Sequence, residues 1–250
     1  MKGMIFIFTR KYSFAGTVFE ICSIYESIHE MCKDYISEDE ADFRIEICLD
    51  DIELERKYSE KTDIAEGRMP INYKDGYLET LAVYRKMCTE LQAKDTILYH
   101  GSVIAVDGEA FLFTAKSGTG KSTHTANWRK YFGDRAVMVN DDKPLLKITD
   151  NGVIAYGTPW DGKHHLSTNM SVPLKAVCIL TRSETNMIGK IDPHEYFGLL
   201  LQQAFRPKDP VKLAGVLNLI ERFFKNTEFY KLGCNMDISS AEVAYNGMKG

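Results

Sequence analysis

The sequence predicts an α/β fold in which helices cover a mixed sheet. Residues 110–114 form an apolar run of strand length that leads into a glycine-rich loop and then a helical pattern. Asp107-Gly108 and Asp150-Asn151-Gly152 each lie between two apolar runs and predict hairpins, because such tight turns need positive φ. Two hairpins beside a strand–loop–helix unit favour a mixed sheet over an all-parallel one.

Residues 96–250 carry most of these patterns and are predicted to form one domain. The first hairpin pairs residues 101–106 with 110–115. The helix after the loop covers residues 122–131, and Gly133 is a suitable C-cap. Further strands are predicted at 136–139, 145–149, 153–156, 172–181 and 228–232, and further helices at 193–205, 210–225 and from Ser239 onward.

Residues 1–95 form a separate α/β region whose role the sequence leaves open. Residues 4–8 and the alternating segment 43–49 predict strands, and residues 77–92 predict an amphipathic helix. The acidic segment 50–55 predicts a solvated face or loop rather than a metal site, because nothing nearby completes a ligand set.

Composition restricts the class of protein. The chain of 250 residues has a formal net charge of −4, with the apolar and charged content of an ordinary globular protein. The acidic balance disfavours a nucleic-acid partner, and no apolar run is long enough for a membrane helix. The first apolar run is too short for a signal peptide, and the six cysteines include no Cys-x-x-Cys pair. We therefore expect reduced thiols in a cytoplasmic protein.

Residues 115–122, Ala-Lys-Ser-Gly-Thr-Gly-Lys-Ser, have the spacing of a phosphate-binding loop, or Walker A motif. Its glycines let backbone N–H groups turn towards a phosphate, and the N-terminus of the following helix adds its dipole. Lys121 would reach the β- and γ-phosphates of ATP, and the Ser122 hydroxyl would bind Mg²⁺. The expected nucleotide-binding residues are Ser117, Gly118, Thr119, Gly120, Lys121, Ser122 and Thr123.

Asp141 and Asp142 follow the predicted strand 136–139, at the position where a carboxylate for Mg²⁺ is expected. Adjacent side chains at a strand end point in different directions, so one can face the metal and the other an acceptor hydroxyl. A polar turn before Lys143-Pro144 is the alternative interpretation. The first hairpin places His100 beside the loop, where it could contact phosphate or tune an aspartate; a structural histidine is the alternative interpretation.

Two further segments contain residue types that bind phosphates or acceptors. Residues 157–165, Gly-Thr-Pro-Trp-Asp-Gly-Lys-His-His, predict a loop that recognises an acceptor or phosphate, or an ordinary polar surface loop. His164 and His165 do not predict a metal site, because adjacent side chains diverge and no paired ligands accompany them. Arg206 suits a phosphate contact and a cap at a helix end equally.

His100-Gly101, the hairpin, residues 117–123 and the Asp-Asp pair together resemble the catalytic domain of HPr kinase/phosphorylase. More broadly, they resemble the kinases related to phosphoenolpyruvate carboxykinase. The resemblance covers about residues 96–182 and implies that His100 and Asp141 are catalytic and that Asp142 joins Ser122 at the metal. Lys116 stands where that family usually has Asp, and the downstream Gly-rich segment that serves HPr recognition is absent, so the resemblance does not extend to HPr as the substrate.

Together these residues predict an ATP-dependent kinase that uses Mg²⁺ and transfers the γ-phosphoryl group to a hydroxyl acceptor. Asp141 would accept the hydroxyl proton, while Lys121 and the metal neutralise phosphate charge. The acceptor is a serine of a protein or peptide, or a free small molecule such as an amino acid. An ATP-binding regulatory module without turnover is the alternative. A carboxykinase-type decarboxylase is disfavoured, because the chain is short and no oxaloacetate site is visible. Homo-oligomerisation stays open.

Overall fold

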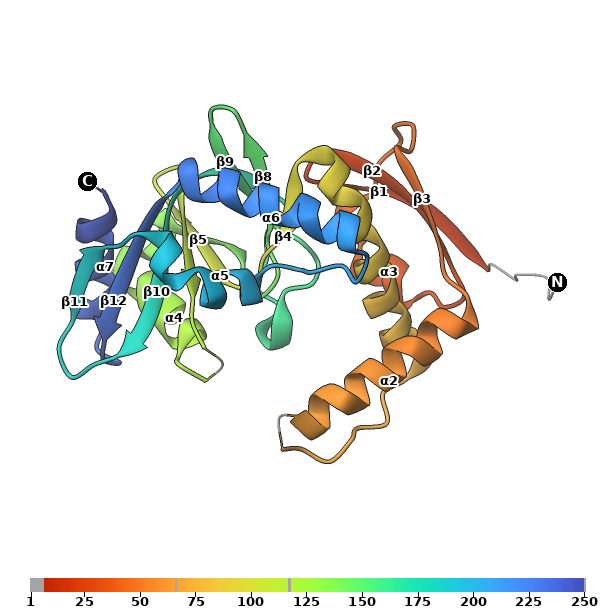
Figure 1. The fold of residues 1–250 in the computed structure, drawn as a ribbon, viewed down its shortest axis with the longest axis horizontal. Coiled ribbons are helices and arrows are strands. Elements are labelled where there is room, and N and C mark those ends of the chain that lie inside the picture. Colours follow the sequence, from red (N-terminus) through yellow and green to blue (C-terminus); the bar gives the residue numbers. More distant parts are fainter. Residues whose placement is uncertain (1–6, 66, 117, 250) are drawn as a thin grey trace. The chain divides into compact units, whose positions relative to one another are not determined.

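The computed structural model describes residues 7–65, 67–116 and 118–249, which fall into two compact units (Figure 1). The first unit is Met1–Leu91 and the second is Gln92–Gly250. Each unit has its own sheet. Residues 4–6 of the predicted strand 4–8 lie outside the described residues.

The first unit packs helices against a three-stranded sheet. β1 (Phe8–Phe14) and β2 (Thr17–Ser23) form an antiparallel hairpin, and β3 (Phe43–Glu46) lies parallel to β2. The helices are α1 (Ser27–Met31), α2 (Leu49–Ala65) and α3 (Asp75–Leu91), with a 3₁₀ turn at Lys33–Tyr35. The predicted helix 77–92 is therefore confirmed as α3.

Buried carboxylates hold α3 in place within this unit. Glu79 is fully buried, and its carboxylate accepts hydrogen bonds from the backbone N–H groups of Ile24 at 2.6 Å and Tyr25 at 2.9 Å. Arg85 of α3 forms a two-pronged ion pair with Glu55 of α2. A buried carboxylate is costly unless it is hydrogen-bonded, so these contacts fix α3 against β2 and α2.

The second unit is built on a mixed sheet, as predicted. Its strands run in the order β4-β8-β9-β10-β6-β5-β7, with β12 beside β10 and β11 beside β12. β10 pairs antiparallel with β9 through its first residues and parallel with β6 and β12 farther along, and the sheet curls there. The strands are β4 (Thr96–Leu98), β5 (Ser102–Val106), β6 (Glu109–Thr114), β7 (Ala136–Asn140), β8 (Leu145–Thr149), β9 (Gly152–Tyr156), β10 (Ser171–Arg182), β11 (Met187–Lys190) and β12 (Glu228–Cys234).

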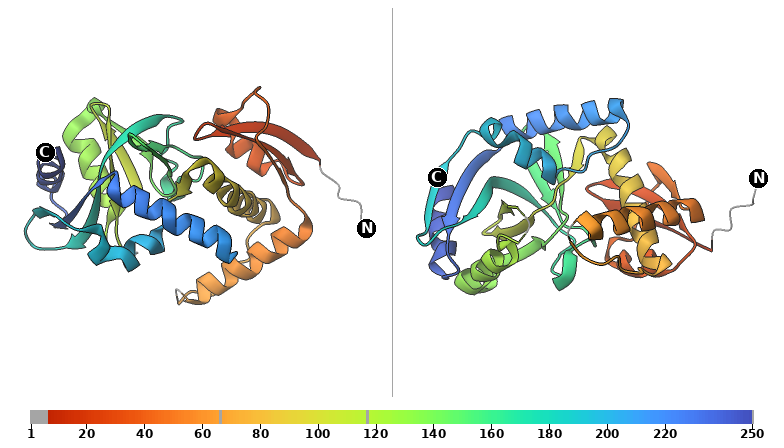
Figure 2. Two further views of the ribbon diagram at one scale, coloured as in Figure 1. Left: turned by 45° about the horizontal axis from the view of Figure 1, so that its top comes forward. Right: turned by 60° about the horizontal axis from the view of Figure 1, so that its bottom comes forward.

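Helices cover both faces of this sheet (Figure 2). α5 (Phe197–Gln203) and α6 (Pro210–Lys225) pack on one face, and α4 (Lys121–Phe132) and α7 (Ser239–Lys249) on the other. Side chains alternate between the faces of a strand. In β6, Leu112 therefore packs in the core under α6, whereas Phe111 and Phe113 pack under α4.

The two predicted hairpins are confirmed. Asp107 and Gly108 have φ of 52° and 84°, the two positive values that their turn requires, and they join β5 to β6 in antiparallel register. β8 and β9 form the second hairpin. The start of α7 at Ser239 is confirmed, and the predicted helix 193–205 divides into a 3₁₀ turn at Pro193–Tyr196 and α5.

The differences from prediction lie mostly in the first unit. The predicted strand 43–49 ends at Glu46, and α2 begins at Leu49. The acidic segment 50–55 therefore forms the first turns of a helix, where carboxylates interact favourably with the N-terminal end of the dipole. The six cysteines form no disulfide with one another, and four of them are buried.

Gly157, which follows β9, passes between two backbone carbonyls. A Cβ there would lie 2.0 Å from the Thr168 oxygen and 2.7 Å from the Val139 oxygen. We expect Gly157→Ala to lower the free energy of unfolding by about 1–3 kcal/mol or more, because backbone must move to admit the methyl group. Gly189→Ala is the matched control, since no atom lies within 4 Å of its Cβ position. Urea unfolding measures both, and equal stabilities would contradict the close approach.

Candidate active site

The glycine loop, residues 115–120, connects β6 to α4. Gly118 and Gly120 have φ of 74° and 116°, values that residues with a Cβ rarely adopt. Gly120 is the N-cap of α4. The first N–H groups of a helix have no partner inside it, so the start of α4 presents donors at Lys121 and Ser122. Ser117, one of the predicted nucleotide-binding residues, lies outside the described residues.

α4 is anchored behind the loop by buried aromatic rings. Trp128 is fully buried and packs against Phe111 and Phe113 of β6. Its indole N–H donates to Nε2 of His124 at 3.0 Å, so this nitrogen is an acceptor and the ring is neutral. Burial lowers the pKa of His124 to about 4. These contacts fix where α4 starts and hence where the glycine loop ends.

Asp141 lies between two serine hydroxyls. Its carboxylate accepts hydrogen bonds from Ser102 Oγ at 2.9 Å and from Ser122 Oγ at 3.4 Å. Ser102 opens β5 and Ser122 lies in the first turn of α4, so one carboxylate joins two separate elements. Burial raises the pKa of Asp141 above its ordinary value, although the two hydroxyls and the His164 charge act in the opposite direction.

Asp142 faces a histidine ring and a lysine ammonium. Nε2 of His100 lies 3.2 Å from its Oδ1, and the Lys143 ammonium pairs with its Oδ2. Burial would raise the pKa of Asp142, but His100 and Lys143 outweigh burial and hold it at about 2. Nδ1 of His100 in turn contacts the side-chain oxygen of Gln203 at 3.0 Å, which orients the ring.

The side chain of Asn140 sets the directions of the two aspartates. Its oxygen accepts the backbone N–H groups of Asp142 at 2.8 Å and Lys143 at 2.6 Å, and its nitrogen donates to the Thr158 carbonyl at 2.9 Å. Asn140 is fully buried, so these bonds satisfy groups that water does not reach. The turn after β7 is therefore fixed, and residues 157–165 are tied to it.

The predicted recognition loop, residues 157–165, lies against the aspartates. A Cβ on Gly162 would be 3.1 Å from Cβ of Asp142, and the His164 charge acts on Asp141. Asp161 is buried and accepts from Ser167 Oγ at 2.9 Å, whereas Lys163, His164 and His165 are exposed. The loop thus has a fixed base and an exposed tip beside the carboxylates.

A hollow of about 530 Å³ is lined in part by the glycine loop, and neither Asp141 nor Asp142 is among its lining residues. Arg182, at the end of β10, donates to the Gly118 carbonyl at 2.7 Å and faces this hollow. The lining residues are Gly118, Thr119, Gly120, Thr123, His124, Asn127, Leu180, Arg182, Ser183, Cys234, Asn235 and Met236. Four of the predicted nucleotide-binding residues, Gly118, Thr119, Gly120 and Thr123, thus line the hollow.

The structure brings most of the predicted residues together. Burial lowers the pKa of Lys121, and the charges of Asp142 and Asp141 oppose that effect, so the lysine lies within electrostatic reach of both carboxylates. Thr119 donates to the Lys116 carbonyl at 2.7 Å inside the loop. Arg206 is exposed. Sequence reasoning missed Ser102, Asn140, Arg182 and Gln203.

Two features are absent from the described residues, 7–65, 67–116 and 118–249. No group of three or more His, Cys, Asp or Glu side chains in this part of the chain could hold a metal ion. No helix among the same residues combines the length and apolar character needed to cross a bilayer.

Comparisons with known proteins identify a family and show distant likeness to solved structures. A family model described as SynChlorMet cassette protein ScmC matches residues 74–205. The chain belongs to the ScmC family. It is also similar to the HPr(Ser) kinase/phosphatase from Coxiella burnetii, with 12% identity and a TM-score of 0.33 over 61% of this chain and 99% of that one. No curated protein matches.

The buried, neutral His124 predicts a loss of stability in acid. Its pKa is about 4 in the fold against 6.5 as its ordinary value, so the fold favours the neutral ring. The contribution of the neutral ring to the free energy of unfolding is fully present above pH 6.5. It is lost as the pH falls through 4, and amounts to about 3 kcal/mol in all.

Both tryptophans, Trp128 and Trp160, belong to the second unit, so their fluorescence reports its urea unfolding. We expect the His124→Gln variant to lose less stability than the wild type between pH 7 and pH 4. Parallel curves for the two proteins would rule out the neutral ring.

Proposed function

We propose that this protein is an ATP-dependent kinase that transfers the γ-phosphoryl group to a hydroxyl acceptor. One observation carries the proposal. Ser122, at the start of the helix behind the glycine loop, contacts Asp141, and the neighbouring Asp142 contacts His100. A phosphate-binding loop, a hydroxyl and two carboxylates with a histidine form the donor set that phosphoryl transfer requires.

The residues also fit Mg²⁺. In nucleotide sites this ion takes one or two protein carboxylates together with phosphate oxygens, and Ser122, Asp141 and Asp142 are all oxygen donors. Asp142 stays ionised far below neutral pH, as a metal ligand must. When bound, Mg²⁺ would neutralise phosphate charge, and Lys121 and the donors at the start of α4 would orient the β- and γ-phosphates.

We assign the proton of the acceptor hydroxyl to Asp141, whose raised pKa makes it the stronger base of the two carboxylates. The Ser122–Asp141 contact favours the opposite division, in which Asp141 joins Ser122 at the metal and Asp142 takes the proton. His100, held by Gln203, orients Asp142 in either case. The nucleoside would occupy the hollow beside Gly118, with Arg182 close to the phosphates.

ADP release from Mg-ATP tests the proposal. The purified protein is assayed with pooled hydroxy amino acids, sugars, nucleosides and serine-containing peptides. Lys121→Ala should reduce stimulated turnover by about 10²-fold or more, because phosphate charge is left uncompensated. Lys130→Ala, an exposed lysine on the same helix, should leave turnover unchanged. Binding of ATP without turnover in any pool would favour a regulatory module, and equal turnover by the Lys121 variant would refute the assignment.

Two amide variants separate the roles of the aspartates. If Asp141 takes the proton, Asp141→Asn should abolish turnover and keep Mg-ATP binding, whereas Asp142→Asn should weaken Mg-ATP binding. Calorimetric titration with Mg-ATP, run beside the ADP assay, measures both properties. The reverse pattern would place Asp141 at the metal and Asp142 at the proton.

A further inference from the structure

β3 is an edge of the first unit's sheet. The strand order is β1-β2-β3, and β2 is the strand that pairs with β3 in the described part of the chain. The opposite edge is partly covered, because Tyr12 of β1 bridges Ile36 and the Ser37 N–H donates to the Lys11 carbonyl at 3.1 Å. The edge of a sheet can pair with another extended chain. In this sheet β3 is the edge at which such a chain could add.

The backbone of β3 is oriented for such pairing. Just beyond the strand, the Ile47 N–H donates to Cys22 at the end of β2, at 3.1 Å. The Glu46 carbonyl points the other way and accepts from Nζ of Lys86 at 2.8 Å. Backbone groups alternate in direction along a strand, so those of Arg44 face away from β2, on the same side as those of Glu46.

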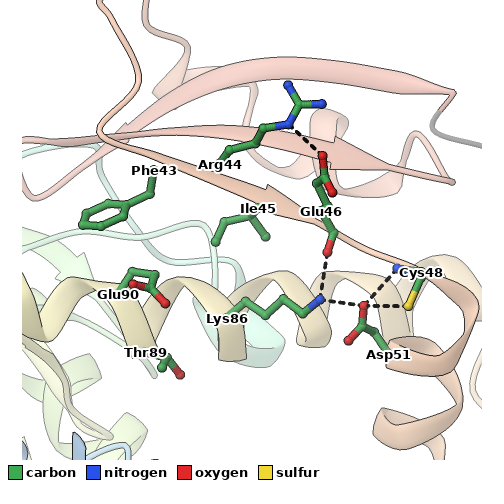
Figure 3. A pocket seen from close by; sticks show the side chains of 9 residues that line it. All are labelled: Phe43, Arg44, Ile45, Glu46, Cys48, Asp51, Lys86, Thr89 and Glu90. Atoms are coloured by element: carbon green, nitrogen blue, oxygen red, sulfur yellow. Dashed lines mark hydrogen bonds and ion pairs between the residues drawn. The ribbon is translucent and has the colours of Figure 1, made fainter. Parts of the chain in front are cut away.

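A groove of about 820 Å³ runs between this edge and α3 (Figure 3). Lys86, Thr89 and Glu90 line it from one face of α3, since residues three and four apart are neighbours on a helix. Figure 3 shows Lys86 reaching Asp51 and the Glu46 carbonyl at one end, so α3 closes that end of the groove. The complete lining is Phe43, Arg44, Ile45, Glu46, Cys48, Asp51, Lys86, Thr89 and Glu90.

The first unit is strongly acidic. Residues 1–91 contain 19 Asp and Glu against 12 Lys and Arg, a formal net charge of −7, whereas residues 92–250 carry +3. The groove lining itself has three carboxylates and two cations. A ligand here should therefore be basic, because charge of the opposite sign speeds encounter and favours binding.

We propose that the β3 edge and its groove bind an extended, basic segment of another polypeptide by strand addition. The segment would exchange main-chain hydrogen bonds with Arg44, and its side chains would alternate between Phe43 and the face of α3 that carries Thr89. Four residues of such a strand extend about 13 Å, the length of β3. This docking does not depend on the kinase proposal, and its readout needs no nucleotide.

A library of random 12-residue peptides displayed on phage is the probe, and the full-length protein is the target. We expect the enriched peptides to be rich in Lys and Arg. Their affinity, measured by fluorescence anisotropy, should fall about tenfold or more in Arg44→Pro, which removes an edge-facing N–H. Proline is tolerated where the N–H faces outward from an edge strand, so the fold should persist. Arg44→Ala keeps the N–H and should bind within about threefold of wild type, since exposed ion pairs contribute little.

Amide exchange of the wild type supplies a readout that does not depend on the variant folding. Bound peptide should slow exchange at Arg44. Three results would each overturn the proposal. Amide exchange at Arg44 could stay unchanged, peptides could bind Arg44→Pro as tightly as the wild type, or the library could yield no more bound peptides on the wild type than on Arg44→Pro. Neutral or acidic enriched peptides would overturn the stated partner class. A wild-type dimer that Arg44→Pro converts to monomer would instead show a second copy of this chain on the edge.

Discussion

The candidate site depends on the pairing of β5 with a strand on each side. β5 lies antiparallel to β6, with Ser102 opposite Phe113, and antiparallel to β7, with Val103 opposite Asn140. Antiparallel neighbours run in opposite directions, so the start of β5 lies beside the ends of β6 and β7. The segment before β5, the glycine loop after β6 and the aspartates after β7 are therefore brought to one edge of the sheet by backbone register alone.

Within that edge, two adjacent carboxylates acquire different chemistry from their partners. Burial raises the pKa of both, but Asp141 is surrounded by hydroxyls while Asp142 faces His100 and Lys143. Hydroxyl donors stabilise a carboxylate less than full charges do, so one pKa ends above its ordinary value and the other below. Pairs of carboxylates whose environments separate them in this way are suited to separate tasks, one as a base and one as a permanent anion.

Local signals in the sequence were enough for most of the second unit, although not for β4 or β11, and for part of the site. Asp107-Gly108 fixed a hairpin, and the glycine loop with Lys121 and Ser122 was recognisable from its spacing alone. Ser102 and Gln203 gave no such signal, because each acquires its contact from a residue far along the chain. The β1–β2 hairpin was missed because its turn contains Ala15 at positive φ, a conformation that alanine rarely adopts. Helix α2 was missed because its many charged residues obscure an apolar face.

The whole-chain net charge concealed a division that bears on binding. A value of −4 indicates no marked attraction to any ligand, yet it is the sum of −7 in the first unit and +3 in the second. A nucleotide is a polyanion, and the basic groups that would receive its phosphates, Lys121 and Arg182, lie in the positive unit. The basic peptide that we propose has the opposite requirement, which the β3 edge of the negative unit would meet. Under these two proposals each unit would repel the ligand of the other, so charge alone would direct the nucleotide and the peptide to different units before any specific contact forms.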